Sequence, residues 1–136
     1  MGSTSKSELM KLAKLMKMRL DWVITIHDKK AIQDMSHTDN YKAIILITDK
    51  PSDQMGHWVA IRAIHGQHYY FDSFGQGAPT KIHKAFRKNG YYHSRIQIQP
   101  LNANWCGQFS LEFLRYVHDR PSYARFLDTF HEINRF

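Results

Sequence analysis

Cysteine is almost absent from this sequence: Cys106 is the single thiol, which cannot form an intramolecular disulfide or, by itself, hold a structural zinc ion. Two catalytic motifs are also missing, because the chain contains no HExxH and no G-x-S-x-G. We therefore expect neither a bound metal nor a serine nucleophile. Cys106 is then either a small apolar packing residue or a reactive group.

Long hydrophobic runs are lacking as well. The longest clean apolar run, residues 43–47, is far shorter than the roughly 20 residues that span a bilayer. No apolar secretory segment follows Met1, and no repeat or low-complexity tract interrupts the chain. We expect a soluble intracellular protein with one compact core, formed by a single domain over residues 1–136.

Acidic residues are outnumbered, with 12 Asp and Glu against 19 Lys and Arg and a formal net charge of +7. Such an excess predicts attraction to polyanions such as nucleic acid, or to an acidic protein face. Composition does not choose between these partners and an ordinary basic surface.

Helical periodicity predicts helices at residues 8–20 after Ser7 as cap, 81–88 after Thr80, 105–118, and from Pro121 through Ile133. In the first of these, three basic side chains, Lys11, Lys14 and Lys17, lie opposite the apolar ones. That apolar set is Leu9, Leu12, Ala13, Met16 and Leu20. The helix is thus expected to face the core on one side and solvent on the other.

Short apolar runs predict strands at residues 41–48, 57–64, 68–74 and 93–99, the middle two forming a hairpin. Residues 22–40 are read as a short strand or turn followed by a loop. Four aromatic residues are expected in the core: Tyr69, Tyr70, Phe71 and Phe74. The order of elements indicates an α+β domain with a small central mixed sheet flanked by helices.

Cys106 falls in the first turn of the third predicted helix, after Asn104 as cap. Unpaired N–H groups and the positive end of the helix dipole favour a thiolate there, and a thiolate is the nucleophilic form. Gly107 leaves room for a substrate backbone to approach.

A reactive cysteine needs a base, and His57 opens one hairpin strand where Asp72 closes the other. With residues 63–66 as a four-residue loop, the two side chains lie directly opposite each other, and the carboxylate orients the imidazole. Loops of two or three residues offset the pair along the strands, and one of them places the side chains on opposite faces. The sequence leaves this register open. Gln99, at the end of a strand, is a candidate oxyanion donor.

Taken together, "GHW" at 56–58, "YFDSFG" at 70–75 and "QPLNANWCGQFSLEFL" at 99–114 resemble the adenovirus protease, adenain, and the related SUMO-deconjugating cysteine proteases. The resemblance covers most of the chain and includes the seven-residue spacing from Gln99 to Cys106 with Asn102 between them. Asp72 is closer to the SUMO-protease form, because adenain typically has glutamate there.

The resemblance implies a cysteine endopeptidase of the adenain and SUMO-protease fold. In it Cys106 is the nucleophile, His57 the base, Asp72 its orienting acid and Gln99 an oxyanion donor, while Trp58 shapes the substrate groove. It further implies cleavage of viral precursor proteins beside small residues such as glycine, during virion maturation, by a monomer located in the host nucleus and the virion.

DNA is the polyanion that the resemblance implies as a cofactor. Candidate phosphate contacts are Lys11, Lys14, Lys17, Lys81, Lys84, Arg87 and Lys88. An activating peptide would bind without a disulfide, because no second cysteine is present. No cofactor is required for the chemistry, and no membrane is involved. Two alternatives stay open: a SUMO- or ubiquitin-like deconjugating protease, and a non-catalytic basic DNA-binding module whose thiol is incidental.

Overall fold

The computed structural model describes residues 4–94, 105–116 and 133–135, and within them the chain forms four helices and six strands. The helices are α1 (Lys6–Leu15), α2 (Lys29–Ser36), α3 (Thr80–Phe86) and α4 (Cys106–Tyr116). The strands are β1 (Trp22–Thr25), β2 (Tyr41–Ile47), β3 (His57–Ile64), β4 (Gln67–Phe71), β5 (Tyr92–Ser94) and β6 (Ile133–Arg135).

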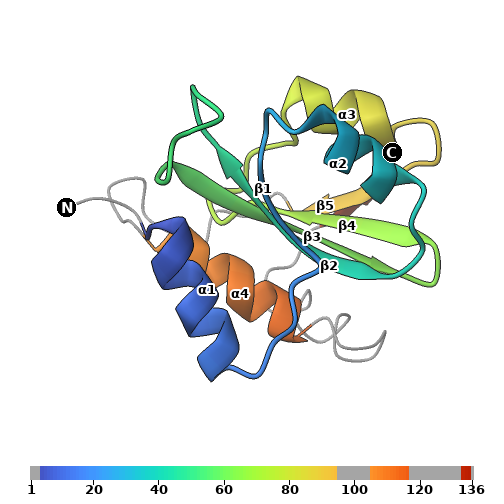
Figure 1. Ribbon diagram of the computed structural model, residues 1–136. Helices are drawn as coiled ribbons and strands as arrows, with labels where there is room; N and C mark the ends of the chain where they lie inside the picture. Colours follow the sequence, from blue (N-terminus) through green and yellow to red (C-terminus); the bar gives the residue numbers. More distant parts are fainter. Residues whose placement is uncertain (1–3, 95–104, 117–132, 136) are drawn as a thin grey trace.

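These strands form one mixed sheet in the order β1-β2-β3-β4-β5-β6. The β1–β2 and β4–β5 pairs are parallel, and the other neighbouring pairs are antiparallel. Helices α1 and α4 cover one face of the sheet, and α2 and α3 cover the other (Figure 1). The α+β architecture with a central mixed sheet flanked by helices is therefore confirmed.

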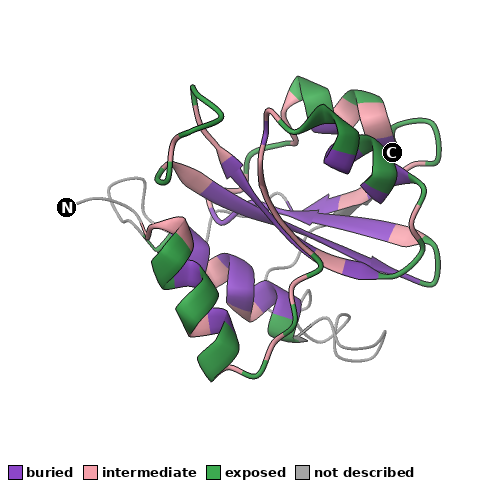
Figure 2. Ribbon diagram, viewed as in Figure 1, coloured by how far each residue is buried: buried purple, intermediate pink, exposed green. Residues whose placement is uncertain are grey.

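The hydrophobic core lies on both faces of β3, which is buried along almost its whole length (Figure 2). Val59, Ile61 and Ala63 pack toward α2 and α3, whereas Trp58 belongs to a cluster with residues of α1 and α4. A strand buried on both faces has a nearly continuous apolar sequence, and residues 58–64 are apolar apart from the buried Arg62. This burial makes the start of β3 a rigid base for the candidate site.

Helix α1 begins two residues earlier than the sequence indicates. Ser5, not Ser7, is the N-cap: its hydroxyl accepts from the Glu8 N–H at 3.2 Å, and the Glu8 carboxylate accepts from the Ser5 N–H at 3.2 Å. This reciprocal capping box outweighs the alternative cap because it satisfies two N–H groups at once. The helix ends at Leu15, and Lys17 takes a left-handed φ of 56°. The apolar rhythm of residues 16–20 therefore belongs to the following loop.

Helix α2 is missing from the sequence-based prediction, which placed a loop there. Asp28 caps it by accepting from the Ala31 N–H at 3.1 Å, and Ala31, Ile32 and Met35 are buried. The helix has only eight residues, and polar side chains stand between the buried ones, so the helical spacing of apolar residues is too short to be recognised in the sequence. Tertiary packing of this apolar stripe against the sheet and α3 makes the helix stable.

The hairpin register is the two-residue-loop alternative, because Ile64 pairs with Gln67. His65 and Gly66 form the turn with φ of 52° and 77°, the left-handed values that a type I′ turn requires at both positions. The four-residue loop that would set His57 directly opposite Asp72 is therefore wrong. In the observed register, continued past the last paired residues, Asp72 lies opposite Val59, two residues from His57 on the same face.

Two further expectations at element ends are corrected. Thr80 is the first residue of α3 rather than its cap; Pro79 precedes it and no side chain caps the helix. Ile133 was expected in a last helix but begins β6. Its backbone hydrogen bonds are made with β5, a distant part of the chain, and helical spacing of apolar residues carries no information about such pairing. The rest of that expected helix lies outside the described residues.

Within the described part of the chain, no helix has the length and apolar character needed to span a membrane.

Candidate active site

Cys106 is the first residue of α4, which confirms its predicted place in the first turn of a helix. Its backbone N–H belongs to the first turn, where N–H groups have no acceptor within the helix. The Sγ accepts a hydrogen bond from the Trp58 N–H at 3.3 Å and lies 4.0 Å from the Gly56 carbonyl oxygen. The Ser110 hydroxyl donates to the Trp58 carbonyl at 3.2 Å, so both backbone groups of Trp58 are bound to α4. The sulfur is thereby held at the start of β3.

His57 and Asp72 are brought together across the hairpin. The imidazole Nε2 lies 2.7 Å from Asp72 Oδ1, and the Asp72 side chain is 2% exposed. The same Oδ1 accepts from the Phe74 N–H at 2.8 Å, which fixes the carboxylate in the turn after β4. A diagonal pair on one sheet face is within reach of side chains of this length, although the two residues are not directly opposite.

The charges around His57 favour its protonated form. Burial by itself lowers the pKa of His57, but hydrogen bonds to Asp72 and Cys106, together with their negative charges, raise that pKa to about 9. Because Nε2 is bound to Asp72, Nδ1 is the ring nitrogen left for the sulfur. The arrangement thus suits an imidazolium between a carboxylate and a thiolate.

Phe74 is a site residue that the sequence-based prediction placed in the core. Its ring stacks on the His57 imidazole with centroids 4.6 Å apart and an interplanar angle of 11°. The other three aromatic residues of that prediction, Tyr69, Tyr70 and Phe71, are buried. The signal in the sequence was Asp72 followed three residues later by Gly75, a turn in which the aspartate binds the backbone two residues on.

Trp58 and Gly107 have different roles from those expected. The Trp58 side chain is 1% exposed and its Nε1 donates to the Thr4 carbonyl at 2.7 Å, so it does not line a surface groove. A Cβ on Gly107 would lie 2.7 Å from Leu9 Cδ1 and 3.3 Å from Trp58 Cδ1. Gly107 therefore permits close packing of α4 on α1 and Trp58, rather than the approach of a substrate.

Access to the sulfur is narrow. Cys106 is 3% exposed, whereas the His57 side chain is 21% exposed. Two large apolar side chains beside the site are exposed in the described part of the chain: Met55, two residues before His57, and Trp105, directly before Cys106. A substrate would reach the sulfur on the side where His57 is open. Gln99, Asn102 and Asn104 lie outside the described residues.

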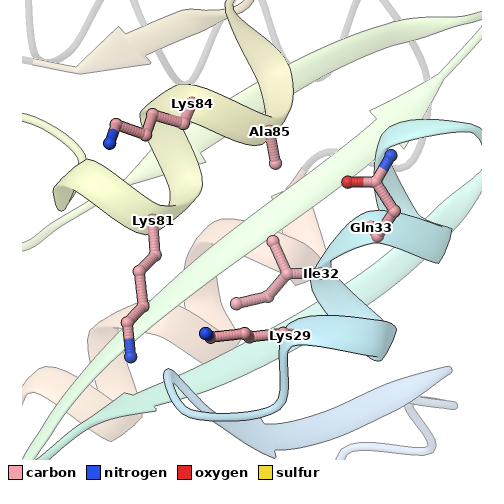
Figure 3. A pocket seen from close by; sticks show the side chains of 6 residues that line it. All are labelled: Lys29, Ile32, Gln33, Lys81, Lys84 and Ala85. Atoms are coloured by element: carbon pink, nitrogen blue, oxygen red, sulfur yellow. The ribbon is translucent and has the colours of Figure 1, made fainter.

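The candidate DNA-contacting residues are all exposed but fall on opposite faces of the sheet (Figure 1). Lys11, Lys14 and Lys17 belong to α1 and the residues after it, and the other four belong to α3 and the residues after it. In a groove of about 270 Å³ between α2 and α3, Lys29 and Lys81 extend toward the same side (Figure 3). No three His, Cys, Asp or Glu side chains in the described ranges are placed to hold a metal ion.

Comparison with known proteins finds a likeness in structure and none in sequence family. No family model and no curated protein matches the sequence. A solved structure of AvrA delL154 with IP6 and CoA is similar in fold, at 19% sequence identity and a TM-score of 0.49. The match covers 80% of this chain and 49% of the AvrA chain, so this chain spans about half the length of that protein.

Proposed function

We propose that this protein is a cysteine hydrolase of acyl bonds, acting as an endopeptidase. One observation carries the proposal: His57 is bound to Asp72 at 2.7 Å, and the N–H of the next residue, Trp58, donates at 3.3 Å to the sulfur of Cys106 at the start of a helix. Nucleophile, base and orienting acid come from three separate elements, and a purely structural cysteine needs none of these contacts.

The chemistry follows the positions of these groups. The Cys106 thiolate attacks the carbonyl carbon, and the N–H at the start of α4 stabilises the negative charge that develops on the carbonyl oxygen. The His57 imidazolium gives its proton to the leaving amine as the C–N bond breaks, which leaves a thioester on the sulfur. Water then attacks the thioester while His57 takes its proton, releasing the acid and restoring the thiolate and imidazolium.

The resemblance to adenain and the SUMO-deconjugating proteases extends the proposal to peptide bonds beside small residues. It also supports Gln99 as a second oxyanion donor, an activating peptide or DNA as cofactors, and viral precursor proteins as the substrates. These extensions are supported by the sequence motifs alone.

Reactivity of the thiol tests the proposal without a known substrate. Wild type and the His57→Ala variant are incubated with iodoacetamide across pH, and modification of Cys106 is followed by mass spectrometry. We expect faster alkylation of wild type than of His57→Ala under the same conditions, because an imidazolium beside the sulfur favours the reactive thiolate. Equal, slow alkylation of both proteins would support an inert packing cysteine and overturn the proposal.

Hydrolysis is then measured with internally quenched peptides that contain Gly-Gly and Gly-Ala bonds, and with diglycine-terminated SUMO and ubiquitin amides. Cleavage by wild type that is abolished in both Cys106→Ala and His57→Ala supports the endopeptidase. Cleavage of only the folded amides would favour the deconjugating alternative. Retained hydrolysis in either variant would refute the roles assigned to these two residues.

A further inference from the structure

A shallow groove follows the exposed side of α1 and ends at the loop before β3. Its volume is about 490 Å³, and its lining comes from five residues of α1 and one of that loop. These are Lys6, Ser7, Met10, Lys11, Lys14 and Gln54. The groove is distinct from the Cys106 site and plays no part in the chemistry proposed above.

The charge on the groove is uniformly positive. Three lining residues are lysines, none is acidic, and within the described chain none of these lysines forms an ion pair. The nearby Glu8 carboxylate is bound to the Ser5 N–H in the capping box at the helix start. The groove thus complements an anionic partner.

The groove also offers an apolar contact. Met10 is 49% exposed and lies between Lys6 and Lys14 on one stripe of the helix, with spacings of four residues. An exposed methionine adapts its shape to varied apolar side chains. Alternating positive and apolar contacts suit a polypeptide with acidic and apolar side chains better than a uniform phosphate backbone.

The groove leads to the candidate active site. The Lys6 N–H donates to the Gln54 carbonyl at 3.1 Å, which ties α1 to the loop. Gln54 is followed by Met55, which is 48% exposed, and by Gly56, whose carbonyl faces the Cys106 sulfur. Three residues of chain span at most about 11 Å, so Gln54 lies within that distance of His57. One extended polypeptide can therefore occupy the groove and present a bond to the sulfur.

We infer that this α1 groove binds a segment of the polypeptide substrate remote from the scissile bond, a segment that carries acidic side chains around an apolar one. The inference rests on the proposed function, because it names the substrate class of that site. It assigns Lys11 and Lys14 to protein recognition rather than to DNA.

Binding is measured on the Cys106→Ala background, so that the result does not depend on turnover. The probe is a fluorescein-labelled peptide in which Asp-Leu-Glu-Asp precedes two glycines. Its binding is measured by fluorescence anisotropy. The Lys11→Gln/Lys14→Gln double variant is compared with Lys81→Gln/Lys84→Gln, which changes the net charge equally on the opposite face of the sheet. Met10→Ser is compared with Leu15→Ser, since Leu15 is 81% exposed on the same helix and does not line the groove.

We expect the α1 double variant to weaken peptide binding by about three- to tenfold, the range that two exposed ion pairs give, while the α3 variant keeps the wild-type Kd. Met10→Ser should weaken binding and Leu15→Ser should not. Equal losses in both double variants would overturn the inference. The inference would also be overturned if the Lys11→Gln/Lys14→Gln variant no longer bound a short labelled DNA duplex but bound the peptide as tightly as wild type. A protein that binds the peptide but hydrolyses nothing refutes the proposed function instead.

Discussion

The Phe74 ring lies flat against the imidazole of His57, with centroids 4.6 Å apart and planes 11° from parallel. The backbone N–H of the same residue donates to Asp72 Oδ1 at 2.8 Å. One residue therefore contacts both the proposed base and its orienting acid. Aromatic stacking restricts rotation of the imidazole, and the Phe74 N–H holds in place the carboxylate that accepts the hydrogen bond from the His57 ring.

Replacing Phe74 by alanine is expected to lower kcat for peptide hydrolysis by roughly tenfold or more, with a smaller change in KM, because the imidazole is no longer held in line with the sulfur. Phe74→Tyr keeps the flat ring and should retain most of the rate. Steady-state kinetics of the two variants give the comparison. A Phe74→Ala enzyme with wild-type kcat would show that the stack does not position His57.

Activity should decline on the alkaline side as His57 loses its proton, at a pH near its raised pKa of about 9. In Asp72→Asn the carboxylate charge is absent, so we expect the alkaline limb of kcat/KM to move to lower pH. The stability of the fold depends on pH in the same direction: because the pKa of His57 is raised above its ordinary value of 6.5, the protonated imidazole stabilises the fold fully below about pH 6.5, and this contribution is lost as pH rises through about 9. An unmoved limb in Asp72→Asn would contradict the coupling.

His68 should make the protein less stable in acid. The residue is 5% exposed, its Nε2 lies 3.1 Å from the Met35 carbonyl, and its ring stacks on Phe86. Burial lowers the pKa of His68, so the unfolded chain binds the proton more readily, and stability falls as pH drops below the unfolded value of 6.5. Urea unfolding between about pH 7.5 and about pH 5.5 measures this slope. The free energy of unfolding should change less with pH in His68→Phe than in wild type. An identical pH dependence in the two proteins would show that another group causes the acid sensitivity.

Three glycines allow a graded test of packing. Gly56→Ala places a Cβ 2.6 Å from the Ile47 carbonyl oxygen, and Gly107→Ala places one 2.7 Å from the end of the Leu9 side chain. Each substitution should lower the free energy of unfolding by about 1–3 kcal/mol. Leu9→Ala should partly rescue only the Gly107 variant, because the atom that obstructs a Cβ at Gly56 is a backbone oxygen, which no substitution removes. Gly77→Ala, whose Cβ meets nothing nearer than 3.9 Å, is the control. Denaturant midpoints of the variants give the comparison. A Gly77→Ala variant as destabilised as the other two would show that close contact of the added Cβ is not the cause.

Local pattern was sufficient for most of the fold. Apolar runs predicted β2, β3 and β4, because strands buried on both faces need apolar side chains at most positions. Helix α4 and the place of Cys106 in its first turn also followed from periodicity. By contrast, α2 was missed, and Ile133 was assigned to a helix, because packing against the sheet and pairing with β5 are contacts with distant parts of the chain.

The residue types at the site, and their order, could be named from the sequence alone, since a thiol at a helix start, a histidine and a carboxylate carry their chemistry in their side chains. Their geometry could not. The left-handed turn at His65 and Gly66 selected the register, and that register set His57 diagonally to Asp72 with Phe74 stacked on the imidazole. Only the packed fold buried Trp58 and left Met10 exposed, because burial depends on which elements meet, and helix periodicity specifies a face without specifying its neighbour.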